Sequence, residues 1–373
     1  MHVVIGPLSR RVRAKPAEPA HALLARLALR NRTTLDGVAR YAGADADGLR
    51  RGEGLDRLGA IAGVDVDALR RCSPARASSC RTVTLGWATM MLGDWTTASR
   101  RRCPECLAQD RLSALGSGEL PEFAVWQRPE WDVRSVFTCV AHGTLLTDRC
   151  PTCGSTVHWS VDSADRCQCG ADLSIADPAP AESAVDAVFV AAIRCERPLP
   201  PQLANLPLGQ SSGFLERLGS LSGGWHAARP AGSMAERVIT RDRGWSLLRA
   251  GASAIDARLN GIVEQAPGKR GLHEAYGWLW GTWLGVPSPN PLVAWLAALV
   301  RTNAVRHGVI APFEGEGGTV SLREAGAMFG VGHARARRIV EELGLVHPAS
   351  RQGVALALDR AAVTAAARSM DRV

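Results

Sequence analysis

The sequence lacks an uninterrupted apolar run that is long enough to cross a membrane. The one long uncharged stretch, residues 276–300, contains Pro287, Pro289 and Pro291. These prolines divide it into two pieces, each shorter than the ~20 residues of a transmembrane helix. Residues 1–16 also lack the apolar core of a secretory signal. We therefore expect a cytoplasmic protein in a reducing compartment, with no membrane as a partner.

The motifs of several catalytic classes are missing as well. The one Gly-Lys pair, Gly268 with Lys269, is followed by Arg270 and lacks the spacing of a nucleotide-binding P-loop. The zinc-protease motif H-E-x-x-H and the H-x-E motif of zinc deaminases are both absent. No acidic triad for two-metal strand transfer emerges from the spacing of the carboxylates. The sequence predicts a protein that is not an enzyme.

Lysine is nearly absent from a chain that is nevertheless basic. Only Lys15 and Lys269 are lysines, so arginine supplies the other 42 of the 44 positive side chains, and the net charge is +8. The planar guanidinium suits phosphate, but genome base composition explains an arginine bias equally well. The charge therefore permits nucleic-acid binding without establishing it.

Length and hydrophobic periodicity predict a mainly α-helical protein of several domains, with small irregular β-structure. We expect an N-terminal helical, helix-turn-helix-like domain (16–100), a double zinc-binding region (101–172), a linker with one embedded helix (173–212), a helical domain (213–310) and a C-terminal helix-turn-helix (319–373). The first domain is either a helix-turn-helix bundle or a plain helical docking module. The zinc-binding region is short of helical periodicity, which favours metal-stapled hairpins.

Within the later regions, two helices are predicted individually. The linker helix should cover about 181–195, between clusters of prolines. A second helix should start at Asn290, followed by Pro291, and continue to about Val305, because asparagine caps helices and proline favours the first helical position.

Seven of the ten cysteines fall between Cys103 and Cys169. They form four pairs with metal-ligand spacing, one of which uses a histidine: Cys103 with Cys106, Cys139 with His142, Cys150 with Cys153, and Cys167 with Cys169. Eight such ligands suit two structural Zn²⁺ ions with no open position for water. The pairing is either consecutive or cross-braced.

Several residues near these pairs carry further expectations. Gly154 and Gly170 stand where zinc knuckles commonly place glycine. The remaining cysteines, Cys72, Cys80 and Cys195, have no partner at ligand spacing and should be small buried hydrophobic residues.

The segment 321–346 has the pattern of a helix-turn-helix. Gly326 allows two helices to cross closely and Gly330 permits the turn between them. The inward-facing apolar positions should be Ala325, Phe329, Val331, Ala336 and Ile339. The outward-facing residues predicted to contact nucleic acid are His333, Arg335, Arg337 and Arg338. The unit either binds DNA or docks a protein, and the following run, 353–358, is either a wing or a packing strand.

The segment around the cysteines resembles the TniQ family, the target-selection subunit of transposons with heteromeric transposases. The resemblance rests on RRCPECL, Trp126, Trp131, TCVAHGTLL, RCPTCG and CGADL, and it covers residues 16–175. The segment AEPAHALL departs from the Gly-Glu-Ser-Leu-like start of the first helix in family members. YGWLWGTWL and the terminal helix-turn-helix are similar to the less uniform second half of such proteins.

The resemblance implies an N-terminal helix-turn-helix, paired zinc motifs and an adaptor role in DNA transposition. Such an adaptor links target recognition, by DNA itself or by an RNA-guided effector complex, to an AAA+ ATPase that recruits the transposase. The alternative is a zinc-ribbon helix-turn-helix transcriptional regulator that binds an operator. The sequence leaves open whether an RNA-guided complex takes part and whether the protein forms a homodimer.

Overall fold

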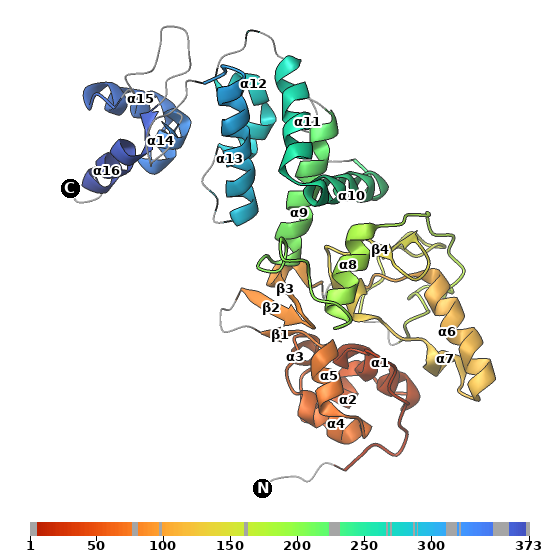
Figure 1. The fold of residues 1–373 in the computed structure, drawn as a ribbon. Helices are drawn as coiled ribbons and strands as arrows, with labels where there is room; N and C mark the ends of the chain where they lie inside the picture. The colour runs from red at the N-terminus through yellow and green to blue at the C-terminus, as the bar shows by residue number, and fades with distance from the viewer. Residues whose placement is uncertain are drawn as a thin grey trace. The chain divides into compact units, whose positions relative to one another are not determined.

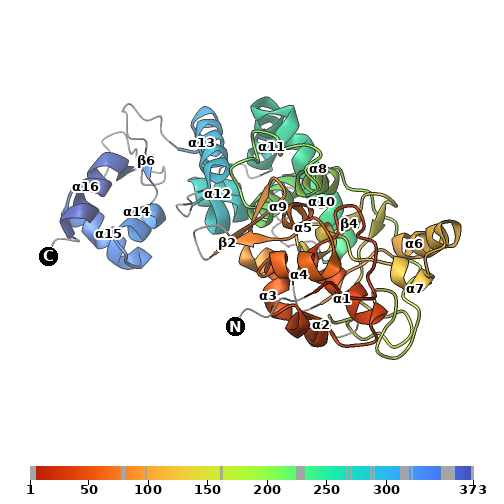
Figure 2. The same cartoon turned by 90° about the horizontal axis from the view of Figure 1, so that it is seen from below.

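The computed structural model describes residues 6–76, 81–96, 99–159, 163–223, 232–265, 268, 271–285, 288, 290–310, 319–320, 322–345 and 358–370. The chain forms two compact units, Met1–Gly213 with Ser233–Asp242 and Phe214–Gly232 with Arg243–Val373. Both are mainly α-helical, as predicted, and the described strands form small antiparallel sheets (Figures 1 and 2). In the described part of the chain, no helix combines the length and apolarity that a membrane crossing requires.

The first unit begins with a bundle of five short helices. They are α1 (Ala20–Arg30), α2 (Leu35–Tyr41), α3 (Ala46–Arg50), α4 (Leu55–Ala62) and α5 (Val66–Cys72). Thr34 caps α2, Asp45 caps α3 and Asp65 caps α5, each by accepting a hydrogen bond from a backbone amide of the first turn. Leu23 and Leu27 of α1 are fully buried in the common apolar core. The amphipathic spacing expected for this region thus forms a real bundle.

A three-stranded antiparallel sheet follows the bundle and was not predicted within 16–100. Its strands are β1 (Ala75–Arg76), β2 (Thr82–Leu85) and β3 (Ala88–Met91). Strands β2 and β3 pair from Thr82 opposite Met91 to Leu85 opposite Ala88. The strands are too short for their alternation to stand out in the sequence.

The metal-ligand region contains more helix than expected. After η1 (Leu92–Asp94) come α6 (Pro104–Ser117), α7 (Pro121–Ala124), η2 (Pro129–Asp132), β4 (Thr138–Cys139) and β5 (Thr144–Leu145). The expectation of hairpins alone was wrong for α6. This helix starts with proline and buries Leu107 and Ala114, but it also exposes Leu112 and Leu115. Its apolar residues are spread around the helix, so they do not form the single stripe by which a helix is usually predicted.

The linker helix exists, as α8 (Ala184–Ile193), and it packs against the sheet. Trp87 N donates to Ala192 O at 2.9 Å. Gly86, with φ of 59°, lies so close to α8 that an added Cβ would be 2.2 Å from Ile193 O. Glycine is therefore required at this turn.

Helices dominate the second unit. Helices α9 (Leu208–Gly219) and α10 (Met234–Ala250) contribute residues to both units, and η3 (Ser220–Gly223), α11 (Ala252–Glu264), α12 (Leu272–Tyr276), the π-helix η4 (Leu279–Leu284) and α13 (Pro291–Arg306) follow. Asn290 caps α13 as predicted, accepting from Leu292 N at 2.9 Å. The buried Tyr276 hydroxyl donates to Asn303 Oδ1 at 2.7 Å, which joins α12 to α13.

The chain ends in a helix-turn-helix with its own core. It comprises β6 (Thr319–Val320), α14 (Leu322–Met328), α15 (His333–Glu342), β7 (Leu358–Asp359) and α16 (Arg360–Met370). Ala325, Phe329 and Ala336 are buried, whereas Val331 and Ile339 are half-buried against this core.

The two glycines behave as expected. An added Cβ at Gly326 would lie 3.2 Å from Ala336 Cβ, and Gly330 has φ of 64°. Leu358, the last residue of the run 353–358, pairs with Val320 in a two-stranded sheet. Residues 353–357 lie outside the described residues.

Candidate metal centres

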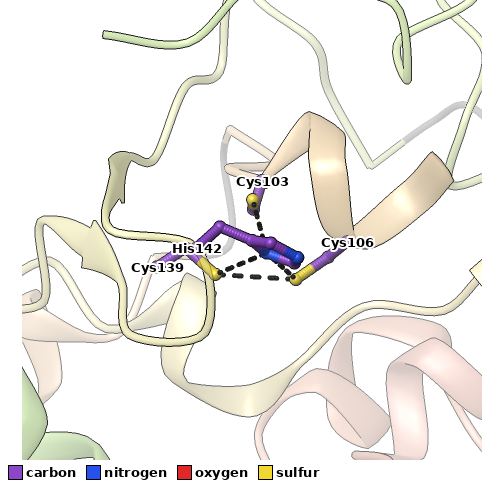
Figure 3. A group of neighbouring side chains, drawn as sticks. All are labelled: Cys103, Cys106, Cys139 and His142. Atoms are coloured by element: carbon purple, nitrogen blue, oxygen red, sulfur yellow. Dashed lines mark hydrogen bonds between the residues drawn. The ribbon is translucent and has the colours of Figure 1, made fainter. Parts of the chain in front are cut away.

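Four of the predicted ligands, which we call the first metal cluster, converge at the start of α6. They are Cys103, Cys106, Cys139 and His142, and their ligand atoms all lie within 4.8 Å of one another (Figure 3). Cys103 directly precedes α6 and Cys106 lies in its first turn, while Cys139 ends β4 and His142 follows in the turn to β5. The three cysteines are buried and His142 is half-buried.

The distances in this cluster fit a tetrahedral ion. His142 Nδ1 lies 3.5 Å from Cys103 Sγ, 3.2 Å from Cys106 Sγ and 3.5 Å from Cys139 Sγ. Zinc–sulfur bonds of about 2.3 Å and zinc–nitrogen bonds of about 2.0 Å give tetrahedron edges of about 3.5–3.8 Å. The donor set therefore fits a closed Zn²⁺ site, because four protein donors leave no position for a catalytic water.

The other four predicted ligands, the second metal cluster, are Cys150, Cys153, Cys167 and Cys169. Cys150 Sγ lies 3.7 Å from Cys169 Sγ, and Cys153 Sγ lies 3.8 Å from Cys167 Sγ. These are again the edges of a zinc–sulfur tetrahedron. The eight residues are thus grouped consecutively along the chain, which is the simpler of the two pairings considered.

The two clusters differ in burial and in the elements that carry them. In the second cluster, Cys153 and Cys169 are exposed while Cys150 and Cys167 are buried. Its cysteines lie in turns that close with Gly154 (φ of 69°) and Gly170 (φ of 84°), a left-handed conformation that suits glycine and agrees with the expected knuckle positions.

Hydrogen bonds shift the pKa values of the clustered thiols in opposite directions, and bonding with Cys103 raises the pKa of Cys139 to about 11. Bonds from the thiols of Cys106 and Cys139 hold the pKa of Cys103 well below its ordinary value. In the second cluster, the backbone amide of Ser155 lowers the pKa of Cys153 to about 6. Each cluster therefore contains a cysteine, Cys103 or Cys153, that is biased toward the thiolate, the form of cysteine that binds metal.

A run of three arginines directly before Cys103 supports the metal region from inside. Arg100 and Arg102 are buried, and burial lowers the pKa of Arg100 and of Arg101 to about 10. Arg101 donates to Trp131 O at 2.8 Å and to Val136 O at 2.6 Å. Arg102 donates to Arg149 O at 2.6 Å, one residue before Cys150. These side chains donate hydrogen bonds to backbone carbonyls in this region. An interpretation of arginine as surface charge, made from the sequence alone, misses this role.

A buried ion pair supports the first metal cluster and was also missed. Asp186 accepts from Thr138 N at 2.8 Å and from Thr138 Oγ1 at 2.9 Å, directly before Cys139. Arg241 Nη2 donates to Asp186 Oδ1 at 2.6 Å, and both side chains are fully buried. Burial raises the pKa of Asp186. No motif links residues 186 and 241, so the sequence gives no signal for this pair.

The cysteines outside the clusters are less buried than expected. Cys72 and Cys195 are half-buried because both line one pocket beside α5 and the end of α8. Burial still raises the pKa of Cys72 to about 11. Cys80 lies outside the described residues.

The residues predicted to contact nucleic acid share the exposed side of α15. These are His333, Arg335, Arg337 and Arg338, and all four are exposed. Arg337 Nε lies 3.2 Å from Glu341 Oε1, so part of this basic face is neutralised. The α15 side chains therefore present positive charge to solvent, in contrast to the buried arginine run before Cys103.

Comparison with known proteins agrees with this arrangement in the first unit. The family model TniQ matches residues 9–146, which include the helical bundle, the sheet and all of the first metal cluster. Comparison with curated proteins finds no match. Over residues 9–146, the chain is thus similar to the TniQ family.

Proposed function

We propose that the protein is a zinc-stabilised, TniQ-like adaptor in DNA transposition. It would link target recognition, by DNA or an RNA-guided effector complex, to an AAA+ ATPase and the transposase. The observation that carries this proposal is the TniQ match over a region whose four potential ligands form a tetrahedral cluster. Two closed sites of this kind support structural zinc rather than catalysis.

A reconstituted reaction tests the adaptor role. Purified chain, an AAA+ transposition ATPase, a transposase and donor DNA are combined, and insertion sites are sequenced with and without the chain. We expect insertions at the selected site to require the chain. Insertion sites that stay the same without it contradict the proposal, and repression of an operator without the ATPase favours a transcriptional regulator.

We further propose that α15 contacts DNA through its exposed basic face. Replacing Arg335 and Arg338 by alanine should weaken DNA binding and reduce the salt slope by about 0.9 for each phosphate that the variant no longer neutralises. R258A, which removes an exposed arginine from α11, is the matched control. If R335A/R338A leaves affinity and salt slope unchanged, the helix-turn-helix docks a protein instead.

A further inference from the structure

The three most exposed large hydrophobic side chains in the described part of the chain belong to the first unit, two of them on α6 and the third in a segment that is hydrogen-bonded to α6. They are Ile175, Leu115 and Leu112, with 73%, 70% and 69% of their surface exposed. We call them the α6 apolar patch. Helix α6 lies at the margin of its unit in both views (Figures 1 and 2). Exposed aliphatic groups gathered in this way mark contact surfaces more often than isolated ones do.

The internal packing of α6 does not account for its two exposed leucines. Leu112 and Leu115 are three residues apart, so they are neighbours on one side of the helix. A neighbouring side of the helix already carries the buried Leu107 and Ala114. Helix α6 is thus apolar on two sides, and only one of them faces the core of the unit.

Arg111 links α6 to the segment that contains Ile175. Arg111 Nε donates to Asp165 Oδ2 at 2.8 Å, and Arg111 Nη1 donates to Ser174 Oγ at 3.0 Å and also to Asp172. The two metal clusters fix the same pieces of chain, since Cys106 lies in the first turn of α6 and the partner segment follows Cys169. The patch is therefore a preformed surface rather than a loose loop.

The elements that carry the patch, and α7 packed against α6, also carry exposed carboxylates, although the chain is basic. Glu105 lies seven residues before Leu112, which places it on the same stripe of α6, and it is exposed. Asp177, two residues after Ile175, and Glu122 on α7 are also exposed. Nearby cations are already paired with carboxylates: Arg111 with Asp165, Arg128 with Asp110, and Arg166 with Asp172.

We propose that the α6 apolar patch binds a basic amphipathic segment of another protein. Aliphatic side chains of the partner would cover Leu112, Leu115 and Ile175, and its lysines or arginines would face Glu105, Glu122 and Asp177. DNA is disfavoured here because the exposed charges are carboxylates. A second copy is disfavoured as well, because a two-fold contact would place one acidic rim against another.

Two synthetic peptides test this chemistry on the full-length, zinc-loaded chain. One is a fluorescent amphipathic helix with leucines on one side and flanking lysines, and the other has glutamate in place of every lysine. We expect the lysine peptide to bind more tightly, and L112Q/L115Q to weaken its binding by about tenfold or more. I239Q, which alters a 52% exposed isoleucine on α10 of the same unit, should leave binding unchanged.

Four further measurements make the outcome decisive. Zinc content and thermal melting establish that L112Q/L115Q folds, and E105Q/E122Q should weaken lysine-peptide binding about two- to fivefold at low salt. Equal binding of both peptides, or equal effects of L112Q/L115Q and I239Q, would overturn the proposal. So would a concentration-dependent dimer, measured by light scattering, that L112Q/L115Q abolishes. None of these results depends on transposition activity. A failure of this binding proposal can therefore be distinguished from a failure of the adaptor role.

Discussion

The two metal clusters use nearly the same donors but differ in how the fold surrounds them. The first places its cysteines in the interior, where a helix start, a strand end and the buried Asp186–Arg241 pair meet. The second lies in turns, and two of its four cysteines are exposed. The same ligand chemistry can therefore form part of the core in one place and cross-link surface turns in another. Removing the first ion should disturb the unit as a whole, and removing the second should act locally.

The largest expected effect comes from breaking each cluster at the equivalent cysteine. C106A should abolish cooperative folding of the first unit, because zinc binding to such sites contributes on the order of 10 kcal/mol and the site is part of the interior. C153A should leave that unit folded, with one zinc per chain and a lower melting temperature. Metal content and calorimetry measure both variants, and equal losses of stability would remove the distinction.

The buried Asp186–Arg241 ion pair allows the surroundings of the first cluster to be tested without removing a metal ligand. R241M should lower the free energy of unfolding by about 3–5 kcal/mol, because it leaves the Asp186 carboxylate buried without its counter-charge. The matched control is R70M, which removes an exposed arginine 2.8 Å from Asp67 and should cost less than about 1 kcal/mol. Urea unfolding measures both, and a cost for R241M similar to that of R70M would show that the pair does not support the first cluster.

The smallest effect should come from separating the two clusters. R111Q removes the ion pairs between α6 and the segment around Cys167, so it should cost about 1–2 kcal/mol while both ions remain bound. In a double-mutant cycle with C153A, the loss of stability in the double variant should be smaller than the sum of the two single losses. The reason is that C153A already frees that segment. Strict additivity would mean that Arg111 does not couple the clusters.

The sequence was a good guide to features that are local in the chain. The ligand pairs, the cap at Asn290 and the glycines of the helix-turn-helix each follow from spacing of a few residues, and the structure brings the ligands together. The amphipathic helices of the first bundle follow from periodicity in the same way.

The features that were missed depend on contacts between distant residues or on weak local patterns. Asp186 and Arg241 are far apart in sequence, and the buried Arg100 and Arg102 look like surface charge until their carbonyl partners are known. Helix α6 was missed because its second apolar face, at Leu112 and Leu115, masks the helical period. That same anomaly marks the surface proposed to bind a partner.

The difference between the clusters is tested most directly by following zinc release to a chelator with native mass spectrometry. The chain should start with two zinc ions and pass through a long-lived one-zinc species, because the exposed residues Cys153 and Cys169 give the chelator access to the second cluster first. C153A should start as that one-zinc species and lose its ion at the slow rate. Fewer than two ions at the start, or simultaneous loss of both, would contradict the account.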